Sequence, residues 1–97
     1  MNSIPMETRM KAMGQRIKEL RENAHLTQGE LAEKVYVSRE MMCYIENGRR
    51  YPIIDVLIAI ADLFDVSLDY LCGRAGKQRV VRVSDEELLH ERRPNEP

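Results

Sequence analysis

The residues between Ser38 and Gly48 carry hydrogen-bonding side chains at helical spacing. If this run is a helix, Met42 and Ile45 face inward, and the outward set is Arg39, Glu40, Cys43, Tyr44 and Asn47. An arginine can donate two hydrogen bonds to a guanine, and a glutamate can accept one from the amino group of a cytosine. The pattern is therefore suited to contacts with base edges, although an ordinary solvated helix face has the same polarity.

Two short helices that meet across a tight turn are expected to position this run. Thr27 followed by Glu30 forms a capping box, which satisfies free amide groups at a helix start. Ser38 supplies the capping oxygen of the second helix, and Gly48 is placed to end it. Residues 26–49 thus predict a helix-turn-helix, whose second helix enters the DNA major groove. This spacing favours a DNA interface over a merely solvated face.

The sequence offers no pattern of residues that indicates catalysis or cofactor binding. It has no Gly-rich phosphate loop, and no nucleophile and base in motif context. Cys43 and Cys72 lack metal-ligand spacing, and without a signal peptide they are expected to be reduced thiols. No apolar run approaches the ~20 residues of a membrane helix. We expect a cytoplasmic protein that is not an enzyme, with no catalytic residue, metal or cofactor.

The net charge of −1 does not indicate a nucleic-acid partner, but the charge is unevenly distributed. Basic residues gather in the first expected helix and directly after Gly48, namely Arg9, Lys11, Arg16, Lys18, Arg21, Arg49 and Arg50. Acidic residues gather near the C-terminus, namely Asp85, Glu86, Glu87, Glu91 and Glu96. A local basic face matters more for phosphate contact than the total charge does.

Helices are expected on both sides of the motif. Apolar residues at steps of three and four predict a first helix from Met6 to about Asn23, although Gly14 also allows a start near Met13. A second helix is expected over residues 54–64, with a core-facing stripe of Ile54, Leu57, Ile60, Ala61 and Phe64. Ser67 and Gly73 are expected to cap a short last helix.

The helix over residues 54–64 has more apolar residues than one buried face requires. The surplus is Ile53, Val56, Ile58 and Leu63. A surface patch of this kind usually marks a partner. We therefore expect a homodimer whose interface includes Ile53, Val56 and Ile58.

The composition changes after Gly73. A basic linker leads to residues 78–83, which alternate like a strand, and Ser84 with Glu87 predicts a short acidic helix. One strand is not stable alone, so it must pair with a partner, pack on the helices or remain disordered. We divide the chain into an N-terminal extension (1–12), a helix-turn-helix domain (13–74) and a C-terminal extension (75–97) for dimerisation or partner binding.

Between Met13 and Arg74 the sequence resembles the XRE family, the lambda-repressor and Cro-like helix-turn-helix domains. The motifs appear in order as R-I-K-x-L-R, L-T-Q-x-E-L-A, V-S-R, I-E-N-G-R, P, L-x-x-I-A and V-S-L-D-x-L. The resemblance implies an all-α fold of five helices, with helices two and three forming the reading unit.

The resemblance also implies roles for individual residues. The expected base-reading residues are Arg39, Glu40 and Tyr44, with Met41 at the margin of the same face. The expected phosphate contacts are Gln28, Ser38, Asn47, Arg49 and Arg50. Arg21 and Glu46 match a pair that some members join between helices one and three to orient the recognition helix. Three residues depart from the family: Tyr36 stands where the turn often has Gly, and Ile53 and Ile58 replace polar residues.

These features lead us to expect a sequence-specific transcriptional regulator, a repressor that binds a palindromic operator in double-stranded DNA as a homodimer. Two alternatives remain open. The chain could be the antitoxin of a toxin–antitoxin pair, with the segment from Gly76 binding the toxin. It could also be a protein-binding module without DNA affinity, which would agree with the net charge of −1.

Overall fold

The structure, a computed structural model, describes residues 4–74 of the 97-residue chain. These residues form five helices: α1 (Met6–Asn23), α2 (Gln28–Lys34), α3 (Arg39–Glu46), α4 (Ile54–Phe64) and α5 (Leu68–Cys72). This confirms the expected five-helix all-α fold. None of the described helices is long and apolar enough to cross a membrane. The expected strand over 78–83 and the acidic helix after Ser84 lie outside the described residues.

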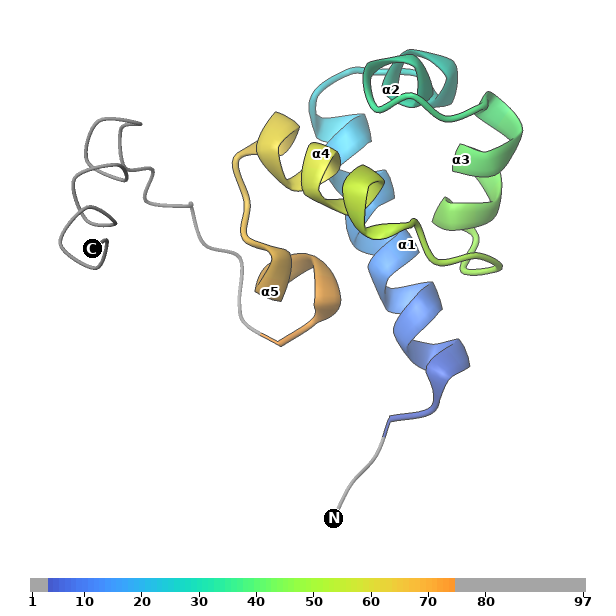
Figure 1. Cartoon of the computed structure of the whole chain (residues 1–97), viewed down its shortest axis with the longest axis vertical. Coiled ribbons are helices and arrows are strands. Elements are labelled where there is room, and N and C mark those ends of the chain that lie inside the picture. The colour runs from blue at the N-terminus through green and yellow to red at the C-terminus, as the bar shows by residue number, and fades with distance from the viewer. Residues whose placement is uncertain (1–3, 75–97) are drawn as a thin grey trace, which may run out of the picture.

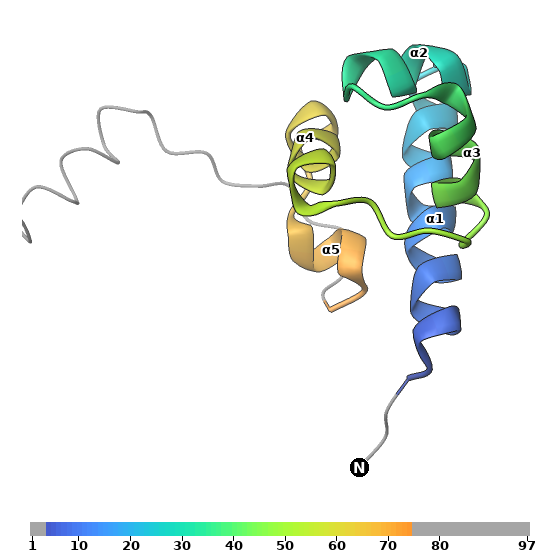
Figure 2. The ribbon, with the colours of Figure 1, turned by 45° about the vertical axis from the view of Figure 1, so that its right-hand side comes forward.

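Helix α1 is the long central element of the fold. It lies between α3 on one side and α4 with α5 on the other, and α2 covers its C-terminal end (Figures 1 and 2). It begins at Met6 and not near Met13, so the longer of the two expected helices is present. The helix therefore runs without a break through the predicted boundary between residues 12 and 13.

The core is built from apolar residues of every helix. Its fully buried members come from all parts of the fold and include Ile17, Leu31, Met42, Ile45, Ile60 and Leu71. Met42 and Ile45 face inward from α3, as their spacing predicts. The side of α3 opposite these two residues is thereby left to face away from the protein.

Helix α4 is rotated relative to the sequence-based expectation. Ile54, expected in the core, is 60 % exposed, whereas Val56, expected at a dimer interface, is only 8 % exposed and packs in the core. The prediction that Val56 contacts a partner is therefore wrong. Ile53 and Ile58 do lie on the surface, at 68 % and 41 % exposure. A helix with apolar residues on most of its circumference does not reveal from its sequence which stripe is buried.

Local capping explains where most helices begin and end. Ser67 Oγ accepts a hydrogen bond from Tyr70 N at 2.9 Å, and Gly73 ends α5 with a positive φ of 82°, as expected. Helices α1 and α4 differ, because their N-cap residues, Pro5 and Ile53, make no side-chain hydrogen bond. Helix α4 therefore lacks a polar cap in the structure, as its sequence indicated.

Candidate nucleic-acid interface

The starts of α2 and α3 are fixed by side-chain caps. Thr27 Oγ1 accepts from Glu30 N at 3.1 Å, and Thr27 N donates to Glu30 Oε1 at 2.8 Å, which confirms the capping box. Ser38 Oγ accepts from Met41 N at 2.9 Å. Such caps satisfy amide groups that the first helical turn leaves free, so they define the residue at which each helix begins.

The turn between α2 and α3 is a Schellman motif that has Tyr36 at its left-handed position. Tyr36 has a φ of 65°, its amide donates to Glu33 O at 3.4 Å, and Val37 N donates to Ala32 O at 3.0 Å. A non-glycine residue in this conformation costs about 1–2 kcal/mol. The tyrosine side chain is 91 % exposed, so little packing offsets this strain.

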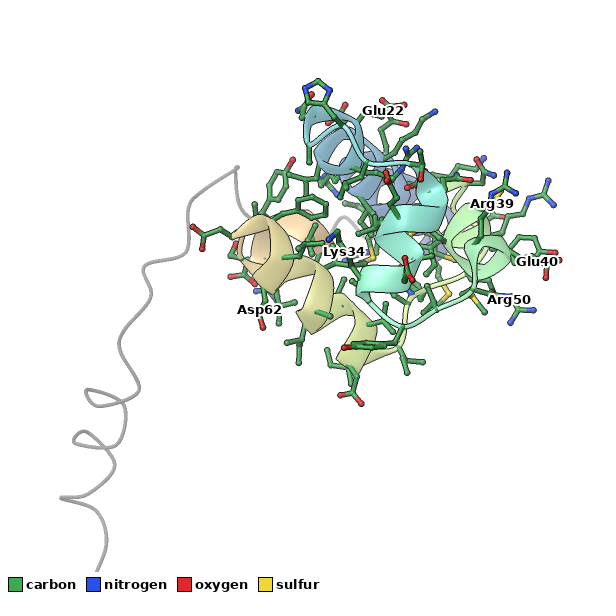
Figure 3. The ribbon with its side chains drawn as sticks, turned by 90° about the horizontal axis from the view of Figure 1, so that it is seen from above. Glu22, Lys34, Arg39, Glu40, Arg50 and Asp62 are labelled. Carbon is green, nitrogen blue, oxygen red and sulfur yellow. The ribbon has the colours of Figure 1, made fainter. Side chains whose placement is uncertain are left out.

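Helix α3 presents its polar face to solvent. Arg39 and Glu40 are exposed and point away from the protein on the same side as Arg50 (Figure 3). Tyr44 and Cys43 are half-buried, and Tyr44 Oη donates to Glu40 Oε2 at 3.4 Å. Together with Gln28 of α2, these four α3 residues line one shallow depression.

Met41 is separated from the other predicted base-reading residues. It is half-buried, packs against the core and lines a different groove, which it shares with residues of the turn and of the α3–α4 loop. Cys43, which was not among the predicted base-reading residues, takes its place beside Arg39 and Tyr44. Helical spacing had placed Cys43 on the outward face of α3, so this spacing was the feature of the sequence that indicated its position.

A buried ion pair joins α1 to α3. Arg21 Nε donates to Glu46 Oε2 at 2.6 Å, and Arg21 Nη2 donates to Glu46 Oε1 at 3.0 Å. The two residues are only 9 % and 5 % exposed. This is the contact that the family resemblance implies. The hydrogen bonds to Glu46 raise the pKa of Arg21 above its ordinary value despite the opposing effect of burial, so this guanidinium remains charged.

The same carboxylate also holds α2. Gln28 Nε2 donates to Glu46 Oε1 at 3.0 Å, and Arg21 Nη1 donates to Leu26 O at 2.8 Å. Helices α1, α2 and α3 are therefore linked by one polar network. A glutamine amide has two hydrogens, so Gln28 keeps one for a further acceptor such as a phosphate oxygen.

Of the other predicted phosphate contacts, three lie beyond the C-terminal end of α3 and one lies at its N-terminal end. Asn47, Arg49 and Arg50 are exposed, and the hydroxyl of Ser38 serves as the cap of the same helix. Gly48 ends α3 as expected, with a φ of 75° and a hydrogen bond from Arg49 N to Tyr44 O at 2.8 Å. The backbone of the loop that follows α3 is thus fixed in direction. The exposed side chains of Arg49 and Arg50 can reach outward from it.

Two glycines, Gly48 and Gly14, allow α1 to approach α3 closely. The sequence indicated a structural role only for Gly48, as the residue that ends α3. A Cβ on Gly48 would lie 2.6 Å from Lys11 Cγ and 2.7 Å from Lys11 Cα. A Cβ on Gly14 would lie 2.5 Å from Glu46 O and closer still to Ile45 O, both backbone atoms. From the sequence alone, Gly14 is only a residue that disfavours the first helix. In the structure it is the point where α1 contacts the end of α3.

The chain is similar to known DNA-binding regulators in both sequence and structure. The sequence model of the helix-turn-helix family matches residues 17–71. The transcriptional regulator ImmR of Bacillus subtilis (strain 168) is 35 % identical over 79 residues, which make up 81 % of this chain and 60 % of that protein. The chain spans between 28 % and 65 % of the length of the first four curated relatives.

Solved structures show the same fold. The c2 repressor of P22, crystallised with a synthetic operator, aligns with a TM-score of 0.62 at 28 % identity and covers 65 % of this chain and 96 % of its own. SinR in complex with DNA aligns with a TM-score of 0.56 at 35 % identity and covers 61 % of this chain and 95 % of its own. The matched residues include the whole of α2 and α3. The chain belongs to the XRE-type helix-turn-helix family.

Proposed function

We propose that this protein is a sequence-specific DNA-binding transcriptional regulator that represses from a palindromic operator as a homodimer. The observation that carries the proposal is the polar face of α3, which is exposed beside Gln28 and held by the Arg21–Glu46 network. The names of its relatives agree, because ImmR is a transcriptional regulator and the P22 c2 repressor was solved with an operator.

Within this proposal, the depression on α3 meets the base edges in the major groove. Arg39 donates two hydrogen bonds to a guanine, and Glu40 accepts from a cytosine amino group. The hydrogen bond between Tyr44 and Glu40 limits the positions that this carboxylate can take. Cys43 lies between these residues and offers a small, weakly polar surface.

Phosphate contacts then fix the register of α3 on the duplex. Gln28 contacts the backbone at the start of α2, and Asn47, Arg49 and Arg50 contact it beyond the end of α3. Contacts from α2 and from the loop after α3 restrict the tilt of the recognition helix, and they carry no sequence information themselves. Helix α3 is therefore expected to lie in the groove with one rotation and one depth.

The apolar surface of α4 supports the proposed homodimer. Ile53, Ile54 and Ile58 are exposed at the start and along one side of this helix. Pairing of two such surfaces about a twofold axis presents two α3 helices to two half-sites. In a helix-turn-helix dimer the half-sites are about 34–36 Å apart, one turn of DNA. The operator is then palindromic because the protein is symmetric.

Selection of bound sequences from a random DNA pool tests DNA binding, palindromy and half-site spacing together. We expect an inverted repeat with half-sites one helical turn apart. At fixed salt, Arg39→Ala should weaken binding to the selected site by about 1–3 kcal/mol and relax one base position. Lys34→Ala, on α2 and turned away from Arg39 (Figure 3), is the matched control. Unchanged affinity of Arg39→Ala would show that α3 does not read the bases.

Two further measurements test assembly and the direction of regulation. Sedimentation equilibrium should give a dimeric mass, and a monomer at high protein concentration would contradict the homodimer. A reporter gene with the selected site inside its promoter should be expressed less when the protein is present. Increased expression would indicate an activator and would contradict repression alone.

A further inference from the structure

The first two turns of α1, residues 6–12, belong to a longer stretch of the chain that precedes the part matching the family. The match begins at residue 17, whereas α1 begins at Met6. In both views these turns extend past the C-terminal end of α3 and past α5 (Figures 1 and 2). They are far from the polar face of α3 that carries Arg39, yet close to the loop that follows α3.

Lys11 is the residue of this extension that contacts the loop. Its Cα and Cγ would lie 2.7 Å and 2.6 Å from a Cβ placed on Gly48, so its backbone and the base of its side chain pack directly against that glycine. Gly48 is flanked in sequence by Asn47 and Arg49, both exposed. The ammonium of Lys11 therefore leaves α1 beside the end of the recognition helix.

The charge of Lys11 is available for a ligand. The residue is exposed, and the ion pairs within residues 4–74 all involve Arg21 and none involves Lys11. Glu7 lies one helical turn earlier, in the first turn of α1, where the helix dipole favours a negative charge. Lys11 is thus an unpaired cation next to Arg49 and Arg50, which follow Gly48 directly.

We propose that Lys11 binds a DNA phosphate and extends the nucleic-acid interface from the helix-turn-helix onto the N-terminal extension of α1. The inference rests on the proposed DNA binding. Its target is the sugar–phosphate backbone next to the phosphates that Asn47 and Arg49 contact. A lysine ammonium is a compact point charge on a flexible stem, so it binds phosphate without reading sequence. Its contribution is the same for every duplex.

The test uses the full chain, the duplex selected from the random pool and a scrambled duplex of equal length. Lys11→Gln removes the charge but keeps the methylene groups that pack on Gly48, and the two residues have similar helix propensity. Each phosphate contact contributes about 0.9 to the slope of log K against log salt, and a dimer carries two copies of Lys11, so this slope should become shallower by about 2. Affinity should fall by the same factor for both duplexes.

Two variants and one footprint make the result specific to Lys11. Lys34→Gln removes one positive charge from α2 and should leave the slope unchanged, and Lys11→Arg should retain the wild-type slope. Phosphate ethylation interference should show one contact in each half-site that is present with wild-type protein and absent with Lys11→Gln. Equal thermal stability of the variants shows that the change does not come from unfolding.

The possible failures can be told apart. If wild-type protein binds the selected duplex and Lys11→Gln has the wild-type slope and footprint, the assignment of Lys11 is overturned and the proposed function stands. If Lys11→Gln and Lys34→Gln lower the slope equally, the effect is one of overall charge, which also overturns the assignment. If wild-type protein binds no DNA at low salt, both proposals are overturned.

Discussion

Helices α1 to α3 and helices α4 to α5 share one core but are held in place by different interactions. In the first part, α2 and α3 start at side-chain caps and are joined to α1 by the Arg21–Glu46–Gln28 network. In the second part, α4 starts at an uncapped Ile53 and exposes isoleucine side chains. Hydrogen bonds are directional, whereas apolar burial is not. Ser67 caps α5, but among the described helices the polar network that links three of them is found only in the first part, where the orientation of a helix matters for the proposed function.

The largest expected effect comes from removing one member of the ion pair. Glu46→Ala leaves the buried guanidinium of Arg21 without its partner and should destabilise the domain by about 3 kcal/mol. Thermal unfolding should then shift down by about 10 °C or more, since 1 kcal/mol corresponds to about 4–8 °C in a domain of this size. Glu33→Ala, on the exposed surface of α2, is the matched control. Equal midpoints for the two variants would contradict the structural role of the pair.

A double variant separates stability from orientation. Replacing both partners, as Arg21→Met with Glu46→Met, should recover most of the lost stability, because no buried charge remains unpaired. If the network orients α3, DNA affinity should stay low although the domain is folded. Wild-type affinity in the double variant would mean that apolar packing alone directs α3.

The second largest effect is expected at the contact between α1 and α3. Gly14→Ala places a Cβ against the backbone oxygens of Ile45 and Glu46, which cannot move as a flexible side chain can. Overpacking of this kind costs about 1–3 kcal/mol, and we expect the upper half of this range in chemical denaturation. Gly29→Ala is the control, because its Cβ would meet no atom nearer than 3.9 Å. Gly29→Ala should be neutral or slightly stabilising.

A smaller and opposite effect is expected in the turn between α2 and α3. Tyr36→Gly relieves the left-handed backbone and should stabilise the domain by about 1 kcal/mol. Tyr36→Ala removes the aromatic ring but keeps the strain, so it should give no gain. If both variants were equally stable, the strain would not be the cause. The turn would then tolerate tyrosine without cost.

The smallest effect on the monomer is expected at the start of α4. Ile53→Ser supplies the missing cap and should stabilise the monomer by about 0.5–1 kcal/mol, while it removes apolar surface from the proposed dimer interface. Ile53→Ala removes the same surface without capping. Both variants should shift the sedimentation equilibrium toward monomer, and only Ile53→Ser should raise the unfolding midpoint measured at low protein concentration.

Features that depend on neighbouring residues could be predicted from the sequence. The caps at Thr27, Ser38 and Ser67 and the stops at Gly48 and Gly73 are all in place, because each depends on atoms within a few residues. The inward faces of α3 followed from spacing. The ion pair between Arg21 and Glu46 joins residues 25 positions apart, so no local rule predicts it. It was expected only from the resemblance to the family.

Only the tertiary structure decided the features that depend on how the helices pack. The sequence of α4 is apolar around most of its surface, so packing alone selected Val56 for the core and left Ile54 exposed. The sequence determined an outward polar face on α3 that includes Cys43, but the fold decided that Gln28 of α2 lies beside it and that Met41 does not. Gly14 and Lys11 gained their importance in the same way. Their contacts with the end of α3 join residues more than thirty positions apart in the chain, and such contacts form only when α1 and α3 pack.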